Sequence, residues 1–189
     1  MADGTLKVGT ITTSSGSGTI TIGQSGETVD MSNATQTGVG GTMTPFFWSY
    51  LGATQVLPSA TWTKMNMNTE EKDSDNCYDT STYRFTPTEA GIYCFVGRIA
   101  PQTASASIAI KVYKNGSGGS SVKAPISTYT DASATTHPNM IGFAEANGTS
   151  DYVELYGYVN TGINISGANA AGGSAAGQSF WGAYKIIGA

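Results

Sequence analysis

Apolar and polar residues alternate in short runs from about residue 46 to the end of the chain. A period of two places successive side chains on opposite faces of a β-strand. Glycine, asparagine, aspartate, serine or proline bounds the runs, and none of them has the spacing of an amphipathic helix. The predicted strands cover 46–51, 61–67, 82–86, 91–99, 107–114, 121–128, 139–145, 151–159, 163–166 and 179–187.

The run 151–159 shows this alternation well. Val153 and Leu155 fall on one face, which predicts a buried core. The other face carries Tyr152, Glu154, Tyr156 and Tyr158. We therefore expect the tyrosine face to need a partner.

Two tight turns fit between antiparallel strands. Lys114-Asn115-Gly116 and Asn147-Gly148 contain residues that tolerate a positive φ. Ten short strands in a domain of this size predict an all-β antiparallel sandwich or jelly roll.

The first part of the chain has a different pattern. Residues 1–42 contain no aromatic side chain, and their few apolar residues come in small groups between glycine and serine. So few apolar side chains cannot offset the entropy of ordering the segment alone. The many β-branched residues favour a strand-forming arm that shares a core with other chains over a plain Gly/Ser linker. A Gly-rich hinge at 35–44 precedes a compact domain, 43–189.

Composition narrows the classes of function. Charged residues make up 12% of the chain, the net charge is −4, and Lys and Arg are scattered singly. This distribution excludes a basic stripe for nucleic acid and gives no support for binding an anionic membrane surface. The start lacks a secretion signal and no apolar run could span a bilayer, so we expect no membrane insertion. The ten tyrosines, six phenylalanines and three tryptophans supply enough apolar surface for a core.

The reactive residues do not form a recognisable catalytic set. His137 precedes Pro138, and no Gly-x-Ser-x-Gly motif accompanies it. Carboxylates for glycoside cleavage could be drawn only from Glu89, Glu145, Asp151 and Glu154, whose separation one sequence does not set. We expect no enzyme activity and no cofactor. Cys77 and Cys94 allow one disulfide, although two reduced, half-buried thiols are favoured.

Two further groups of residues each have two interpretations. The acidic run from Glu70 to Asp79 offers oxygen ligands to calcium, but an exposed loop is the ordinary outcome, and Asp73 could cap a turn. Aromatic side chains can stack on sugar rings, although in alternating strands they more often belong to a core or a subunit interface. The tryptophans are Trp48, Trp62 and Trp181.

A family resemblance rests on the stretch 73–95. The spacing of its acidic, aromatic and glycine residues resembles the signature of the globular head of the complement first component, a ten-strand jelly roll of the tumour-necrosis-factor superfamily. The signature residues are Asp73, Tyr78, Phe85, Gly91, Tyr93 and Phe95. The Lys-Asn-Gly turn at 114–116 and the stretches 151–155 and 179–182 resemble later strands of that head.

The resemblance covers 43–189 and implies a trimer. It places a set of side chains in the core or at the trimer interface: Tyr78, Phe85, Gly91, Tyr93, Phe95, Phe180 and Gly182. The chain departs from the pattern at Met67, where the family prefers phenylalanine, and at Gly97, where it prefers another aromatic residue.

The arm resembles a second family. The stretch 8–31, followed by Thr44-Pro45-Phe46, is similar to N-terminal arms of virion structural proteins of tailed, especially marine, bacteriophages. It implies a non-enzymatic homotrimer made in the host cytoplasm and displayed on the virion surface as a head decoration or short fibre. Residues 1–42 would bind capsid or tail components, and the head could adhere to a host glycan or receptor. The alternatives are a monomeric carbohydrate-binding module that uses Trp48 or Trp62 and a polysaccharide-degrading enzyme.

Overall fold

The computed structural model describes most of the predicted head. The described residues are 43–103, 105–117, 127–131, 137–167 and 179–186, together with Ile11 and Gly26; for 105, 106 and 127–131 only the backbone is described. The predicted arm, apart from those two residues, lies outside this set, so the division into 1–42 and 43–189 stays a prediction.

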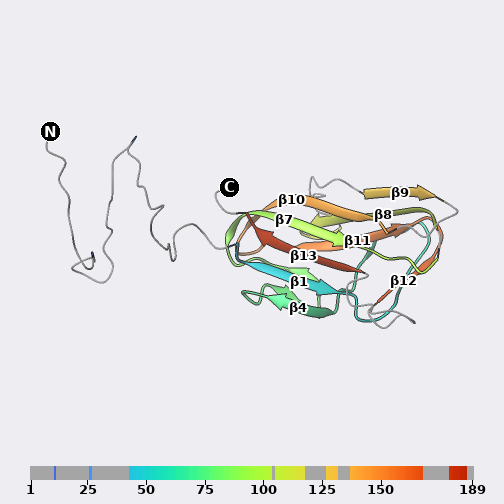
Figure 1. Cartoon of the computed structure of the whole chain (residues 1–189), viewed down its shortest axis with the longest axis horizontal. Coiled ribbons are helices and arrows are strands. Elements are labelled where there is room, and N and C mark those ends of the chain that lie inside the picture. The colour runs from blue at the N-terminus through green and yellow to red at the C-terminus, as the bar shows by residue number, and fades with distance from the viewer. Residues whose placement is uncertain are drawn as a thin grey trace, which may run out of the picture. The chain divides into compact units, whose positions relative to one another are not determined.

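Two antiparallel sheets form a sandwich (Figure 1). The first sheet has the order β10-β7-β13-β1-β4. Its strands are β1 (Phe46–Tyr50), β4 (Thr69–Asp73), β7 (Ala90–Arg98), β10 (Asn139–Asn147) and β13 (Phe180–Lys185). Strands that are adjacent in this sheet are distant in the sequence, so the connections cross between the layers as in a jelly roll.

The second sheet has the order β5-β6-β11-β8-β9, and β3 also pairs with β11. Its strands are β3 (Thr63–Lys64), β5 (Tyr78–Asp79), β6 (Arg84–Phe85), β8 (Ser105–Lys114), β9 (Ser127–Asp131) and β11 (Val153–Val159). A separate antiparallel pair consists of β2 (Gln55–Leu57) and β12 (Ile163–Ile165). No helix among the described residues has the length and apolar character needed to cross a membrane.

Large aromatic side chains fill the space between the two sheets. Phe47 of β1 stacks on Tyr78 and Phe85 of the second sheet, with ring centres 4.5 and 4.7 Å apart. Trp181 of β13 meets Phe47 edge to face at 4.8 Å. The two expected core residues of β11, Val153 and Leu155, are buried here as predicted. Each large side chain removed from water contributes about 1.5–3 kcal/mol, so this cluster holds the two sheets together.

The structure corrects several predicted boundaries. The acidic segment expected as an exposed loop includes strand β4, because its backbone pairs with β1 at Phe47↔Asp73 and Trp48↔Lys72. The predicted strand 61–67 is reduced to β3. The strand predicted at 121–128 is observed at Ser127–Asp131, while residues 121–126 lie outside the described part of the chain. Strand β2 was not among the predicted strands.

The predicted turn residues adopt the backbone that was expected of them. Asn115 and Gly116 have φ values of 60° and 88°, and Gly148 has 71°. A Cβ atom on Gly148 would lie 2.3 Å from the backbone nitrogen of Ala90, so glycine is required there for space as well as for conformation.

Both cysteines are free and buried, in agreement with the reduced interpretation. The Cys77 thiol donates a hydrogen bond to Asp73 Oδ1 at 3.0 Å. Burial, followed by this contact with Asp73, raises the pKa of Cys77 well above its usual range. The thiol therefore stays protonated and unreactive.

Candidate functional site

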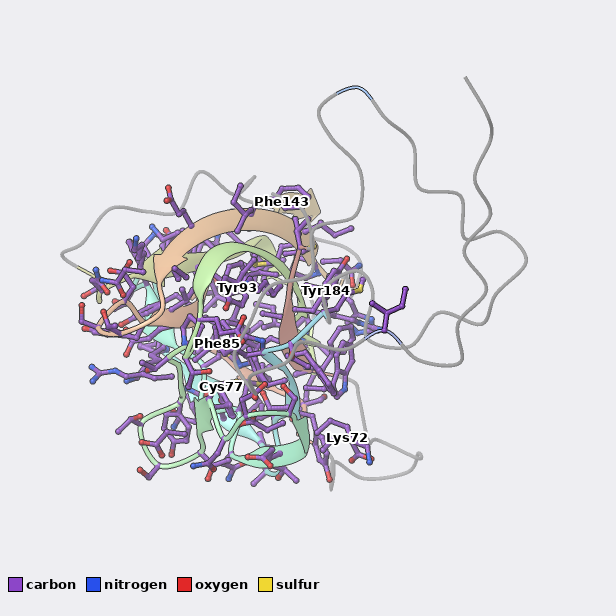
Figure 2. All side chains as sticks on the ribbon, turned by 90° about the vertical axis from the view of Figure 1, so that its left-hand side faces the viewer. Lys72, Cys77, Phe85, Tyr93, Phe143 and Tyr184 are labelled. Atoms are coloured by element: carbon purple, nitrogen blue, oxygen red, sulfur yellow. The ribbon has the colours of Figure 1, made fainter. Side chains whose placement is uncertain are left out.

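The outer face of the first sheet is covered with large apolar side chains. They alternate with the core residues of the same strands and therefore point away from the second sheet. We define this apolar face as Met43, Phe46, Trp48, Tyr50, Ile92, Val96, Ile141, Phe143, Phe180 and Tyr184. Figure 2 labels Phe143 and Tyr184, together with Lys72 at the margin.

Four of these side chains are strongly exposed. The exposed fraction is 60% for Ile141, 53% for Phe143, 50% for Met43 and 37% for Tyr184. Single exposed apolar residues are common on monomers, but a contiguous patch of this kind marks an interaction surface.

The strand register makes the patch continuous. One row across the sheet runs Ile141, Val96, Gly182 and Trp48 on successive strands. The next row runs Phe143, Cys94, Tyr184 and Phe46. The face therefore extends over four neighbouring strands without a charged residue in either row.

Gly182 forms a low point in the middle of this face. Its missing side chain lets the Trp48 ring lie across β13, where it stacks on Phe180 with ring centres 4.6 Å apart. A Cβ atom at Gly182 would lie 2.6 Å from the Phe47 carbonyl oxygen and 2.8 Å from Trp48 Cε3. Beside it lies a hollow of about 410 Å³ lined by Met43, Phe46, Phe47, Trp48, Lys72, Val96, Gly182, Ala183 and Tyr184. The hollow can accept an apolar side chain.

Charged groups lie at the margins of the apolar face. Lys72 stands on β4 beside Trp48, and Lys185 pairs with Glu89 at 2.7 Å. At another margin Arg98 Nη2 lies 2.6 Å from His137 Nδ1. Desolvation and, secondarily, the charge of Arg98 lower the pKa of His137. An apolar centre with a polar rim is the arrangement of a protein interface.

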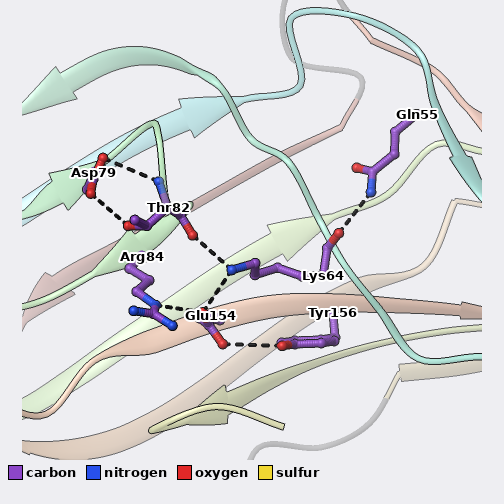
Figure 3. Close-up of polar contacts among 7 residues, drawn as sticks. All are labelled: Gln55, Lys64, Asp79, Thr82, Arg84, Glu154 and Tyr156. Carbon is purple, nitrogen blue, oxygen red and sulfur yellow. Dashed lines mark hydrogen bonds and ion pairs between the residues drawn. The ribbon is translucent and has the colours of Figure 1, made fainter.

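The outer face of the second sheet differs in chemistry. We define this aromatic–basic face as Trp62, Lys64, Arg84, Lys111, Tyr113, Glu154, Tyr156 and Tyr158. Lys64 Nζ and Arg84 Nε lie 3.1 and 2.8 Å from the same atom, Glu154 Oε1 (Figure 3). Glu154 is only 1% exposed. Burial raises its pKa, but the hydrogen bonds from Arg84 and Lys64 outweigh burial and lower it overall.

The predicted tyrosine face of 151–159 is therefore partly covered by its own chain, around Glu154 and Tyr156. Lys64 from β3 and Arg84 from β6 fold over Glu154, and the Tyr156 hydroxyl donates to Glu154 Oε2 at 3.3 Å. The large exposed apolar side chains lie instead on the outer face of the first sheet. A sequence signal for it exists in 139–145, where Ile141 and Phe143 make the second face of the strand apolar as well.

Four of the signature residues lie in the core. Tyr78, Phe85, Tyr93 and Phe95 are buried, the last three completely. Tyr78 donates a hydrogen bond to the Met67 carbonyl at 2.7 Å, and burial raises its pKa to about 12.

The other residues that the resemblance placed in the core or at the trimer interface lie on the first sheet. Phe180 and Gly182 belong to the outer side of β13, and Gly91 of β7 lies against the Lys185 side chain of β13. Their role in a trimer stays a prediction. Gly97 stands where the family prefers an aromatic residue, and the space beside it is bounded by Trp181, Leu155 and Met140.

The remaining candidate residues are spread over the molecule. The described residues contain no group of three His, Cys, Asp or Glu side chains that could hold a metal ion. In the acidic run, Asp73 accepts a hydrogen bond from the Tyr78 backbone at 2.7 Å. Hydrogen bonds from Ser81 and Thr82 hold the pKa of Asp79 well below its usual range. Both carboxylates therefore stabilise turns.

The four carboxylates considered for glycoside cleavage are not gathered into one site. Glu89 pairs with Lys185, Asp151 with Lys114, and Glu154 with Lys64 and Arg84. Glu145 is exposed on β10 of the first sheet, where it pairs in register with Ile92 of β7. Of the tryptophans, Trp181 is in the core, whereas Trp48 and Trp62 are half-buried on the two outer faces.

Comparison with known structures identifies the fold. The chain aligns with PRD1 phage vertex protein P5 at a TM-score of 0.56 and 12% identity, covering 77% of this chain and 99% of that one. It aligns with murine APRIL at a TM-score of 0.53 and 12% identity, covering 75% and 99%. It aligns with the globular domain of zebrafish complement 1qA protein at a TM-score of 0.46 and 11% identity, covering 75% of this chain and 96% of that one. No family model and no curated protein matches the chain.

The described chain therefore has the all-β jelly-roll fold of tumour-necrosis-factor-like domains, and the predicted fold class is confirmed. At identities near 12% the likeness concerns the fold alone. The function has to be argued from the faces of the sandwich.

Proposed function

We propose that the chain is a non-enzymatic structural protein of a phage virion. In this proposal three copies form a surface-exposed knob, a head decoration or a short fibre, and residues 1–42 anchor it to capsid or tail components. The knob would be the part that meets the host.

The exposed apolar face is the observation that carries this proposal. Fully burying a phenylalanine or isoleucine contributes about 1.5–3 kcal/mol, and Ile141 and Phe143 are both more than half exposed in the single chain. Copies of the same chain are the simplest occupant, because they are always present at equal concentration and oligomers close by symmetry. A threefold arrangement also agrees with the trimer implied by the complement-type signature.

The assignment to a virion has separate support. The N-terminal stretch resembles arms of phage virion proteins, and a phage vertex protein is among the structures that share the fold. An arm with few apolar residues fits a segment that is ordered only against other subunits.

The mass of the full-length protein in solution tests self-association. One chain has a mass of 19.5 kDa, and multi-angle light scattering should give three times this value. A folded protein with the mass of one chain would contradict the trimer that the proposal requires.

The anchoring role needs the particle. In a phage that encodes this chain, antibodies should label the surface of purified particles. Deleting residues 1–42 should leave the head folded but abolish its incorporation. Normal incorporation of the truncated head would contradict the anchor.

A further inference from the structure

Lys111 occupies an unusual position on the aromatic–basic face. Its Nζ lies 3.8 Å from the centre of the Trp62 ring and 4.2 Å from the centre of the Tyr113 ring. Cation–π attraction orients the ammonium between the two rings but leaves N–H donors that point away from them. Among the described residues Lys111 forms no ion pair with a carboxylate. It is therefore an ordered cation that can still bind an anion.

Among the side chains that the structure describes, the neighbouring charges leave this part of the face positive. Lys64 and Arg84 share a single carboxylate, that of the buried Glu154. Asp79 stands opposite Arg84 on the edge strand β5 and accepts hydrogen bonds from Ser81 and Thr82. This excess of positive charge is confined to the face, since the chain as a whole has a net charge of −4.

Aromatic rings lie directly beside this charge. The Trp62 and Tyr158 rings are half-buried, with centres 5.3 Å apart. The register places Tyr156 opposite Lys111 and Tyr158 one step further along the same face. Partly exposed rings offer a flat apolar surface to the C–H face of a pyranose, while their polar groups stay hydrated.

We propose that the aromatic–basic face binds an acidic saccharide. A uronic acid unit would place its carboxylate against Lys111 and its ring against the exposed parts of Trp62 and Tyr158 that Lys111 does not cover. The proposal deepens the proposed function by naming a ligand class for the knob. It rests on that function only for the exposure of this face in the assembly.

Charge complementarity favours this occupant over the others. A neutral sugar would use the rings but leave Lys111 without an anion. A second copy would bring its apolar face, which has no carboxylate in its two central rows. Because Lys111 is already held between two rings, little side-chain entropy is lost when it binds a carboxylate.

Isothermal titration of the full-length protein with a galacturonic acid hexasaccharide tests the proposal. Neutral cellohexaose and polyglutamate of matched charge are the comparison ligands. Binding should be at least about tenfold weaker for both, because each offers only one of the two contacts, and a hydrogen bond to a charged group contributes a factor of this size. The affinity should also fall as salt is added.

Lys111→Gln and Lys114→Gln form a matched pair of variants. Both remove one lysine charge from strand β8, but Lys114 is already paired with Asp151 at 2.7 Å. Lys111→Gln should weaken hexasaccharide binding about tenfold, and Lys114→Gln less than twofold. Trp62→Leu should also weaken binding while the melting temperature shows that the variant is folded.

Four results would overturn the proposal: no binding by the wild-type protein, equal binding of cellohexaose, equal binding of polyglutamate, or unchanged affinity in Lys111→Gln. Light scattering on the same samples distinguishes a failure of the saccharide proposal from a failure of the proposed function. A trimer that does not bind the hexasaccharide contradicts only the saccharide proposal. A monomer that binds it contradicts only self-association.

Discussion

The two outer faces of the sandwich follow the same alternation of inward and outward side chains, but their outward side chains differ in whether the chain itself pairs or covers them. On the second sheet, Lys64 and Arg84 from short strands fold over Glu154, so the outward polar group is paired within the chain. On the first sheet, Ile141 and Phe143 stay more than half exposed, and no described element covers them. The charged group on one face is therefore paired within the chain, whereas the apolar side chains on the other are suited to be covered by another copy.

The largest expected effect comes from placing a charge on the apolar face. Phe143→Lys should convert the trimer to single chains, because an ammonium without a partner is costly to bury and the apolar contact is lost. Val56→Lys is the matched control, since Val56 is 66% exposed on β2, away from this face. Light scattering should show one chain for Phe143→Lys and a trimer for Val56→Lys. Equal masses for the two variants would mean that the comparison between the faces is wrong.

The next effect concerns the pairing on the second sheet. Glu154→Gln should lower the free energy of unfolding by about 2–3 kcal/mol, because two cations lose their carboxylate. This loss of stability is smaller than expected for breaking a fully buried ion pair, because the Lys64 and Arg84 side chains are 29% and 39% exposed. Glu145→Gln, at an exposed position on β10, should change stability by less than about 0.5 kcal/mol. Urea unfolding checks both, and light scattering should still show a trimer.

Gly182→Ala tests the packing beneath the apolar face. Its Cβ atom would lie 2.6 Å from a carbonyl oxygen of β1, so we expect a loss of about 1–3 kcal/mol. At Gly97 the nearest atoms would be 3.4 Å away, an ordinary contact, and Gly97→Ala should cost less. Thermal unfolding of the two variants gives the comparison. A larger loss for Gly97→Ala would show that the close contact at Gly182 relaxes at little cost.

The smallest effect is the pH dependence at the margin of the apolar face. The pKa of His137 in the folded chain lies below its ordinary value of 6.5. As the pH falls through 6.5, the unfolded chain therefore takes up this proton first, and stability decreases until the folded-state pKa is passed. His137→Gln should remove this part of the pH dependence. A melting temperature with the same pH profile in both proteins would contradict it.

The sequence predicted the fold class well and the edge strands poorly. Strands such as 91–99 and 151–159 alternate clearly because one face of each is buried in the core. Strand β4 was expected to be a loop because Glu70, Glu71 and Lys72 are exposed on it, and its pairing with β1 leaves no local trace. Pairing at an edge depends on a distant strand, which a local pattern does not contain.

The candidate sites were predicted in part. The sequence indicated that one tyrosine-bearing strand face needs a partner, and the structure finds that partner within the chain. The apolar face was missed because Phe46, Trp48 and Tyr50 belong to a strand with apolar residues on both faces. Such a pattern does not say which face is turned to the core.

The sequence by itself determined that the chain forms short antiparallel strands, which residues share a face, and where glycine and asparagine turn the backbone. The reason is that alternation and φ preferences are local properties. Only the tertiary structure decided which outer face is covered, that Lys111 lies between Trp62 and Tyr113, and that Glu154 is paired. These contacts join strands far apart in the sequence, so they are set by sheet order and register rather than by any local pattern.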